Sequence, residues 1–394
     1  MTDSWLHSPI SGDRFDRHEL IKWWDQNILR EAKILVIGAG AIGNEILKNL
    51  ALLGVGNIFL VDFDIIENSN LSRSVLFHEE DVGSCKTDAA ARAVKEMYPD
   101  ITVESLHGNA VYDLGLGVFW WADIVLCGLD NREARLETSR KCWKTKTPLI
   151  DGGIEKLDGQ IRMFVPPDGP CYECTMSELD WKLLAERRSC TLLTRDYVQT
   201  GHVPTTVTAA AIIAAIQCQE AIKWLHGTSM LAGMGLTYNG TVNELYTVIY
   251  EKKKDCLGHE MLGELIPLGI GAGDMQVREL LSRVESELGP GTVVEMNYDL
   301  LEELQCPYCH EKEEMFVSLG KVKESQLKCP SCRKMRIPHY LQELNSKSDV
   351  MEKTLAQIGV PAFDILTARN GSKQMSFFFD ADAEIVLGEL PYDK

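Results

Sequence analysis

The stretch between residues 33 and 86 constrains the fold more than any other part of the chain. The apolar run Ile34 to Ile37 leads directly into a turn with three glycines, which are Gly38, Gly40 and Gly43. Glycines let a backbone approach a phosphate closely, and the helix after such a turn offers free N–H groups. Asp62 comes about 20 residues later, where an acid typically binds ribose hydroxyls. The pattern predicts a strand, turn and helix that bind a nucleotide, and NAD, FAD and ATP fit it equally.

Two cations and their polar neighbours distinguish between these nucleotides. Beyond Asp62 and Asp64, the chain carries Asn70-Leu71-Ser72-Arg73 and then Lys86. A nicotinamide site needs no extra cations, whereas a triphosphate attacked by a carboxylate needs several negative charges neutralised. Arg73 and Lys86 therefore favour ATP chemistry over that of a dehydrogenase.

Strand-like and helical runs alternate from residue 33 to about residue 153, which is the rhythm of a doubly wound α/β sheet. Binding residues should gather at the carboxyl ends of the strands, where Asp62 and Asp130 are expected. A hairpin-like stretch from Gly159 to Pro166 comes next, then a polar, exposed segment of about residues 177–203, and then a long helix from Thr205 to Leu225. We expect a Rossmann-like doubly wound mixed sheet.

Together with Asp130-Asn131-Arg132, these residues closely resemble the ThiF/MoeB/HesA superfamily, the adenylating domains of ubiquitin-activating enzymes and of sulfur-carrier activators. The resemblance covers roughly residues 14 to 260. It implies that Asp130 holds magnesium, with a solvated helix N-cap before Asn131 as the alternative role. It also implies an ATP site in which Asp62 binds the ribose, Arg73 and Lys86 bind the triphosphate, and Asn70 and Asp64 lie close by. Ser74 replaces the glutamine that usually comes after the arginine.

The N-terminal sequence Phe15-Asp16-Arg17-His18 resembles the family segment whose arginine reaches the ATP of a neighbouring subunit. Arg17 would then act as an arginine finger, which implies a homodimer. The alternative is a surface arginine on an amphipathic helix that continues through Trp23 and Trp24.

The resemblance also implies a reaction. A carboxylate attacks the α-phosphate of ATP to give an acyl-adenylate and pyrophosphate, and the family's carboxylate is the C-terminal glycine of a ubiquitin-like protein. Cys190, after Arg187 and Arg188, lies in a segment that resembles the crossover loop in which a cysteine takes the activated chain as a thioester. Nearby arginines favour the nucleophilic thiolate. The alternative is a small buried residue, as we expect for Cys85, Cys127, Cys142 and Cys218.

Six of the twelve cysteines form three C-x-x-C pairs. The pairs Cys306/Cys309 and Cys329/Cys332 have the spacing of a structural zinc ribbon. In the family, the earlier pair Cys171/Cys174 is completed by a second pair, and here that position holds Cys256 and His259. We therefore expect two structural zinc sites; a redox-active pair is the rival interpretation.

The expected organisation is a helical arm (1–30), a ThiF/MoeB-like adenylation domain (31–260), a helix with a zinc ribbon (261–344) and a small C-terminal α/β segment (345–394). A net charge of −18 argues against nonspecific binding to nucleic acids or anionic membranes. The N-terminus does not resemble a signal peptide, and the apolar stretch 209–216 is too short to span a bilayer, so we expect a cytoplasmic protein.

The hypothesis is an ATP- and magnesium-dependent enzyme that adenylates a ubiquitin-like protein and passes it through Cys190 to a conjugating enzyme, as in bacterial ubiquitin-like conjugation operons. One alternative is adenylation of a sulfur carrier for thiocarboxylate formation in thiamine, molybdopterin or tRNA thiolation. Another is a noncatalytic scaffold subunit of an activating complex.

Overall fold

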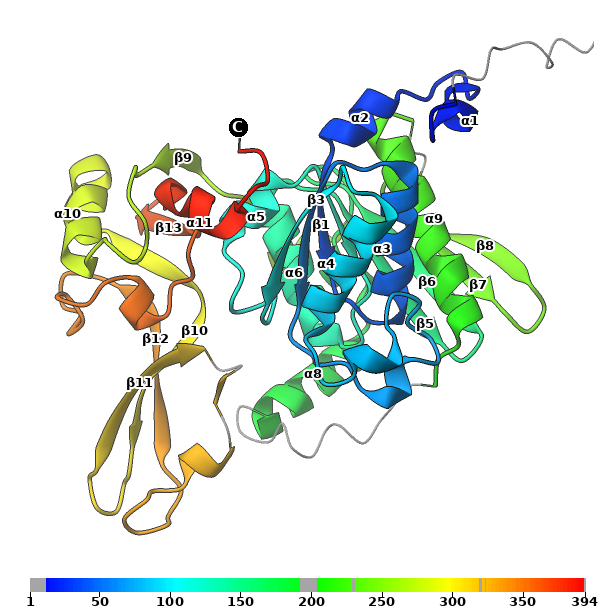
Figure 1. Ribbon diagram of the computed structural model, residues 1–394. Helices are drawn as coiled ribbons and strands as arrows, with labels where there is room; N and C mark the ends of the chain where they lie inside the picture. Colours follow the sequence, from blue (N-terminus) through cyan, green and yellow to red (C-terminus); the bar gives the residue numbers. More distant parts are fainter. Residues whose placement is uncertain (1–11, 192–203, 229–230, 319–320, 323, 393–394) are drawn as a thin grey trace, which may run out of the picture.

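The computed structural model of this chain describes residues 12–191, 204–228, 231–318, 321–322 and 324–392, without the side chains of residues 185–191. Two β-sheets lie beside one another (Figure 1). The N-terminal two thirds of the chain form the first sheet and are called the first unit, and the remainder forms the second sheet and is called the second unit. In the part that is described, no helix is long and apolar enough to cross a bilayer.

The first sheet has eight strands among the described residues, in the order β3-β2-β1-β4-β5-β6-β7-β8. The first five strands along the chain run parallel, and β6, β7 and β8 are added antiparallel. The doubly wound mixed sheet predicted from the sequence is therefore confirmed. Its strands are β1 (Lys33–Ile37), β2 (Asn57–Asp62), β3 (Thr102–His107), β4 (Ile124–Cys127), β5 (Leu149–Glu155), β6 (Asp158–Phe164), β7 (Met234–Asn239) and β8 (Glu244–Ile249).

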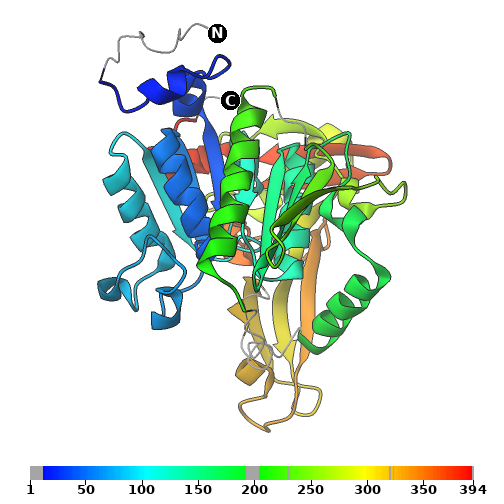
Figure 2. The same cartoon turned by 90° about the vertical axis from the view of Figure 1, so that its right-hand side faces the viewer.

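Strand β1 lies at the centre of this sheet, and all five of its residues are buried. Successive side chains point to opposite faces, so Ile34 and Val36 enter one apolar core while Leu35 and Ile37 enter the other. The first core packs beneath α3 (Ala41–Leu53), α4 (Lys86–Met97) and α9 (Val207–Leu225), and α3 and α9 lie side by side in Figure 2. The second core lies beneath α5 (Leu116–Trp121) and α6 (Arg132–Thr145).

Short helices occupy the connections. The N-terminal arm contains α1 (Asp16–Glu19) and α2 (Gln26–Glu31), so no single helix runs through Trp23 and Trp24. After α7 (Tyr172–Thr175), the segment expected to be an exposed loop begins with α8 (Glu178–Thr191). The reason is local: Ser177 and Asp180 cap each other, because Ser177 N donates to Asp180 Oδ2 (2.8 Å) and Asp180 N donates to Ser177 Oγ (3.2 Å).

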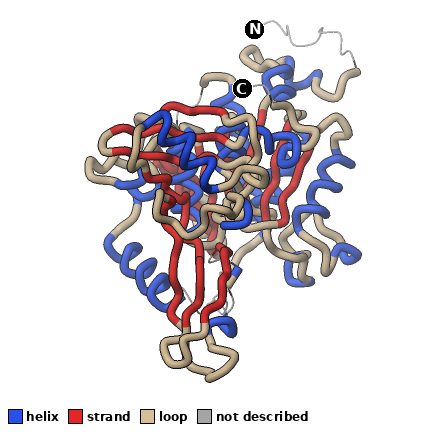
Figure 3. The backbone as a smooth tube through the Cα atoms, turned by 90° about the vertical axis from the view of Figure 1, so that its left-hand side faces the viewer, coloured by secondary structure: helices blue, strands red, loops and turns tan. Residues whose placement is uncertain are grey.

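The second sheet has the strand order β11-β10-β13-β14-β9, and β12 also pairs with β10. It joins residues 261–344 and 345–394, which were expected to be separate segments, into one structure. Strands β10, β11 and β12 extend away from the rest of the molecule (Figure 3), and below they are called the arm. The elements are β9 (Glu264–Pro267), α10 (Val277–Leu288), β10 (Val293–Gln305), β11 (Lys312–Ser318), β12 (Ile337–Leu344), β13 (Ile365–Asn370), β14 (Lys373–Phe378) and α11 (Ala383–Leu387).

The two sheets are joined through α5, which packs directly against the backbone of the second unit. Gly117 N donates to Phe363 O (2.9 Å), and Leu116 N donates to Asp364 Oδ1 (2.7 Å). Phe363 and Phe378 complete the apolar core beneath α5 and α6. Burial raises the pKa of Asp364, so this carboxyl depends on its hydrogen bonds when it is ionised. The second unit thus shares a core with the first.

We expect Gly117→Ala to weaken this junction, because an added Cβ would lie 2.3 Å from the Phe363 carbonyl oxygen. Overpacking of this kind lowers the free energy of unfolding by about 1–3 kcal/mol. Chemical denaturation of the unchanged protein and of Gly117→Ala measures the difference in the free energy of unfolding. Gly273→Ala is the matched control, because a Cβ there meets nothing within 4 Å. Equal stability of the two variants would contradict the tight contact.

Candidate functional site

The glycine turn lies at the carboxyl end of β1, between β2 and β4, where the strand order reverses direction. Open α/β sheets bind ligands in the crevice at such a switch point. The turn is held to both neighbours, because Gly38 N donates to Val61 O (2.8 Å) and Gly128 N donates to Ile37 O (3.2 Å). The fold therefore puts the predicted phosphate-binding turn where a ligand crevice forms.

Each glycine in the turn has a separate reason to be glycine. Gly38 adopts a φ of +98°, and a Cβ at Gly43 would lie 1.8 Å from the Gly38 carbonyl oxygen. A Cβ at Gly40 would meet nothing within 4 Å, so the space beside it is open. Gly40 is also the N-cap of α3 and has no side chain with which to cap it. The turn thus offers an open cradle at a helix N-terminus, which suits an anionic phosphate.

Asp62, at the end of β2, binds the backbone of the glycine turn. Its carboxylate accepts hydrogen bonds from Ala39 N (2.7 Å) and Asp64 N (2.7 Å). Burial raises the pKa of Asp62, and the nearby Lys86 ammonium opposes that rise. The carboxylate is adjacent to the glycine turn, as its predicted role with the ribose requires, and that role stays a prediction.

Lys86 lies beside Asp62 at the same edge. It is 8% exposed, and its Nζ forms an ion pair with Asp64 Oδ2 at 2.7 Å. Backbone pairing brings the two together, because Lys86 N donates to Asp64 O (3.1 Å) and Ile65 bridges to Cys85. Lys86 is the first residue of α4, and its ammonium is therefore held at the carboxyl edge of the sheet.

Asn70 and Arg73 lie on the loop between β2 and α4. Asn70 Oδ1 accepts from Glu67 N (2.9 Å) and closes the short 3-10 helix Asn68–Asn70. Arg73 Nη1 donates to Ser69 O (2.7 Å), and Ser74 beside it is buried. These contacts define the shape of the loop, and contacts of Asn70 and Arg73 with phosphate stay predictions.

Asp130 comes after β4 and is exposed. The alternative role of helix N-cap belongs to its neighbour, because Asn131 Oδ1 accepts from Ala134 N (2.7 Å). Asn131 Nδ2 also lies 3.3 Å from Asp130 Oδ1. A Cβ on Gly38 would lie 3.1 Å from Gly128 O, so the segment of Asp130 adjoins the glycine turn. An exposed carboxylate beside a phosphate cradle fits a magnesium ion, which takes one or two carboxylates together with phosphate oxygens.

The structure does not bring Arg17 to this edge of its own chain. Phe15, next to α1, packs against Gly54 at the C-terminal end of α3. The glycine turn lies at the other end of α3, and a helix of 13 residues is about 20 Å long. Arg17 is exposed on α1, so a role at an ATP site requires a second copy of the chain and stays a prediction.

Cys190 lies in the last turn of α8, and its side chain is outside the described part of the chain. Its predicted role as the thioester cysteine is therefore untested. Cys127, Cys142 and Cys218 are buried as expected, whereas Cys85 is partly exposed.

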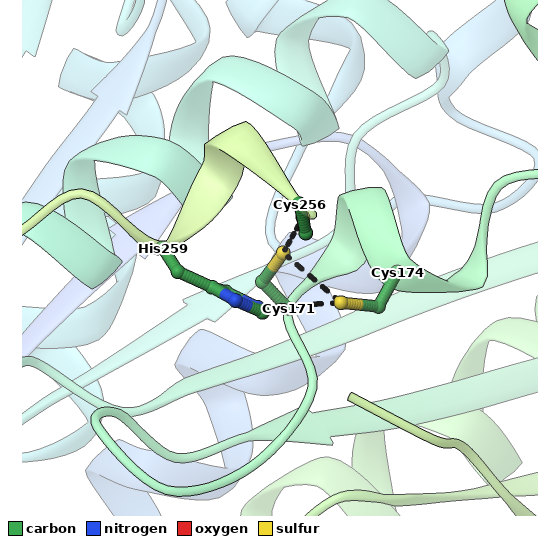
Figure 4. A group of neighbouring side chains, drawn as sticks. All are labelled: Cys171, Cys174, Cys256 and His259. Atoms are coloured by element: carbon green, nitrogen blue, oxygen red, sulfur yellow. Dashed lines mark hydrogen bonds between the residues drawn. The ribbon is translucent and has the colours of Figure 1, made fainter. Parts of the chain in front are cut away.

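The first predicted zinc site is assembled from two segments that are distant in the sequence. Cys171, Cys174, Cys256 and His259 converge, with their ligand atoms all within 4.8 Å of one another (Figure 4). Cys171 Sγ lies 3.5 Å from Cys256 Sγ, and Cys174 Sγ lies 3.3 Å from His259 Nε2. The edge of a tetrahedron with Zn–S bonds of about 2.3 Å is about 3.8 Å. The four groups thus fit one zinc ion.

The histidine of this site is held by its neighbours. The His259 ring lies on the Trp143 ring of α6, with centroids 4.4 Å apart. Arg140 Nη2 of α6 donates to Glu173 (2.8 Å), which lies between the two cysteines of the first pair. The site therefore fastens the loop after β6, and the chain leading to β9, onto α6.

The second predicted site lies at the end of the arm. Cys306 Sγ is 3.4 Å from Cys332 Sγ, and Cys309 Sγ is 3.5 Å from Cys329 Sγ. Cys306 N donates to Glu311 O (2.8 Å) and Cys329 N donates to Lys334 O (2.8 Å), so each pair lies in a tight turn. These four thiols suit a structural zinc ion.

A buried ion cluster beside Asp130 was not predicted from the sequence. Asp151 in β5 pairs with Arg135 of α6 and with Arg162 of β6. In the sequence, this cluster is marked only by a charged residue, Asp151, within the otherwise apolar start of β5. Its partners lie 16 and 11 residues away on other elements, so the sequence pattern does not reveal the pairing.

Comparison with known proteins identifies a matching family and individual relatives. The sequence model of the ThiF family matches residues 16–258. The SAMP-activating enzyme E1 of Haloferax volcanii is 31% identical over 254 residues, which cover 62% of this chain and 87% of that protein. The molybdopterin-synthase adenylyltransferase of Escherichia coli is 30% identical over 236 residues, which cover 58% of this chain and 86% of that protein.

A solved structure supports the fold. The crystal structure of E. coli MccB with ATP has a TM-score of 0.54 and 23% identity, covering 64% of this chain and 75% of that chain. At this identity the likeness concerns the fold alone. The second sheet lies beyond the family match, which ends at residue 258.

Metal analysis of the purified protein should find about two zinc ions per chain, one for each four-ligand group. His259→Ala should lower the content to about one, because three thiolates then remain at the first site. Cys218→Ala, which changes a buried cysteine outside both groups, is the control and should leave the zinc content unchanged. Unchanged zinc in His259→Ala would remove the histidine from the site.

Proposed function

Because this chain belongs to the ThiF family, we propose that it is an activating enzyme that uses ATP to adenylate the C-terminal glycine of a ubiquitin-like protein. The observation that carries the proposal is the pairing of cations and carboxylates with the glycine turn at one edge of the sheet. Lys86, 8% exposed, lies there beside Asp62 and Asp64, and Asp130 lies across the turn.

In the proposed reaction, a carboxylate oxygen of the modifier attacks the α-phosphorus of ATP. The bond to the β-phosphate breaks and pyrophosphate leaves with the electron pair. Lys86 and Arg73 neutralise phosphate charge, and Asp62 holds the ribose. Asp130 holds Mg²⁺, which supplies further neutralisation of the phosphates. No general base is needed, because a carboxylate is already ionised.

We further propose that Cys190 takes the activated chain. Its thiolate attacks the acyl carbon of the adenylate, AMP leaves, and a thioester forms that a conjugating enzyme then accepts. The enzyme acts as a homodimer in which Arg17 of one copy reaches the ATP of the other. We propose the cytoplasm as its location, because twelve cysteines suit metal and thiol chemistry better than disulfides.

The second candidate function is adenylation of a sulfur carrier, which ends in a thiocarboxylate. The likeness to a molybdopterin-synthase adenylyltransferase supports it. The two candidates share the adenylation step and differ in the fate of the adenylate. A noncatalytic scaffold subunit is disfavoured, because the chain retains the predicted ATP-binding residues.

Asp130→Ala should reduce ATP–pyrophosphate exchange dependent on a glycine-ended ubiquitin-like protein by at least about 100-fold, because phosphate charge is then poorly neutralised. Exchange of labelled pyrophosphate into ATP measures it. Asp158→Ala, an exposed carboxylate on β6, is the control. Persistent exchange in Asp130→Ala would remove this residue from the proposed site.

Cys190→Ala should keep pyrophosphate exchange and lose the reductant-sensitive adduct with the modifier, since adenylation precedes thioester formation. Electrophoresis without reductant detects the adduct. Cys142→Ala, which changes a buried cysteine, should retain both. An adduct that survives in Cys190→Ala would move the thioester to another cysteine.

A further inference from the structure

We propose that Arg135 is a positioning residue that holds the segment of Asp130 in place, anchored through a buried ion cluster with Asp151 and Arg162. The inference rests on the metal-binding role proposed above for Asp130 and explains how a residue on an exposed turn keeps one position. It assigns a function to charged groups that the adenylation chemistry itself does not use.

A series of side-chain contacts links Asp151 to the residue directly before Asp130. Arg135 lies in the first turns of α6, and its guanidinium donates through Nη2 to Leu129 O and through Nη1 to Asp151 Oδ1. Leu129 is the residue directly before Asp130. One side chain therefore ties the backbone next to the proposed metal ligand to strand β5.

Asp151 is held from its other side. Arg162 on β6 donates to Asp151 Oδ2 from Nε (3.1 Å) and Nη2 (2.7 Å). The Arg162 guanidinium lies 4.6 Å from the centroid of the Tyr172 ring, and Tyr172 is next to the predicted zinc ligand Cys171. Cys127 Sγ, at the end of β4, also lies 3.3 Å from Asp151 Oδ1. The cluster thus connects β4, β5, β6 and α6 at the edge that carries Asp130.

The residues of β4 and β5 around the cluster leave space for the Arg135 side chain. A Cβ on Gly153 of β5 would lie 3.1 Å from Arg135 Nη2, so a side chain at that position would press on the guanidinium. Gln217 of α9 donates to Cys127 O (2.9 Å) and Ile150 O (3.0 Å), which holds the ends of β4 and β5 together. The surroundings of Arg135 therefore leave its side chain little freedom.

The charges argue for positioning more than for stability. Asp151 is 1% exposed and Arg135 is 9% exposed, so a carboxylate and its partners are withdrawn from water. Desolvation offsets much of the attraction in such a buried pair, and apolar residues of similar volume are often as stabilising. A guanidinium contributes a planar fork that donates in two directions at once, whereas an ammonium acts as a point charge. This geometry suits a residue that must fix a carbonyl and a carboxylate together.

The experiment compares Arg135→Lys and Asp151→Asn with the unchanged protein by binding of Mn²⁺ in the presence of ATP, measured by electron paramagnetic resonance. Manganese takes the same oxygen ligands as magnesium, and no modifier is needed. We expect the affinity for Mn²⁺ to fall about tenfold in both variants, as for other residues that orient a metal ligand. Hydrogen exchange at residues 128–131 should also become faster.

Two readouts and a matched variant separate positioning from general damage. Arg283→Lys changes an arginine on α10, in the second unit, whose partner is Glu287. It should leave both readouts unchanged. A role confined to stability would lower the midpoint of unfolding in Arg135→Lys but leave Mn²⁺ affinity and exchange at 128–131 as they are, and that result would overturn the inference.

Asp130→Ala separates this inference from the proposed function. If Asp130→Ala leaves Mn²⁺ binding with ATP unchanged, the metal role of Asp130 fails, and the positioning inference fails with it. If Asp130→Ala weakens binding and Arg135→Lys does not, the inference about Arg135 alone is wrong. Weaker binding in both, with faster exchange at 128–131 only in Arg135→Lys and Asp151→Asn, supports the inference.

Discussion

The burial of β1 on both of its faces is the constraint on which the rest of the structure depends. Because Ile34 and Val36 enter one core while Leu35 and Ile37 enter the other, helices must cover both sides of the sheet. Strands β2 and β4 then flank β1 on opposite sides, and their connections leave the carboxyl end of β1 open. The glycine turn, Asp62 and Asp130 all depend on that opening for their positions.

The two predicted zinc sites differ in what they connect. The first joins residues of the first unit, Cys171 and Cys174, to Cys256 and His259 on the chain that leads to the second sheet. Since α6 also contacts this loop through its side chains, a metal ion there would fix the start of the second unit against the helix that comes after Asp130. The second site closes the end of the arm formed by β10, β11 and β12, where the buried apolar cluster is small.

The same edge of the sheet also gathers charges whose burial is costly. Asp62 has a raised pKa because of burial, and Asp151 holds two arginines where water is largely excluded. Such groups contribute little net stability. What they provide is a fixed arrangement of N–H groups, ammonium and carboxylates, and the proposed reaction would use such preorganised groups to stabilise a developing charge.

The sequence by itself determined the local features, because the glycine turn, the alternation of strands and helices, and the C-x-x-C pairs depend on backbone conformation and ligand spacing over a few residues. The resemblance to a family added His259 as a partner of distant cysteines. Only the tertiary structure decided which distant groups meet. It put Asn131 rather than Asp130 at the cap of α6, placed Arg17 at the far end of α3, and paired β14 with β9 to complete the second sheet. These contacts depend on the packing of whole elements against one another, and no pattern of neighbouring residues specifies that packing.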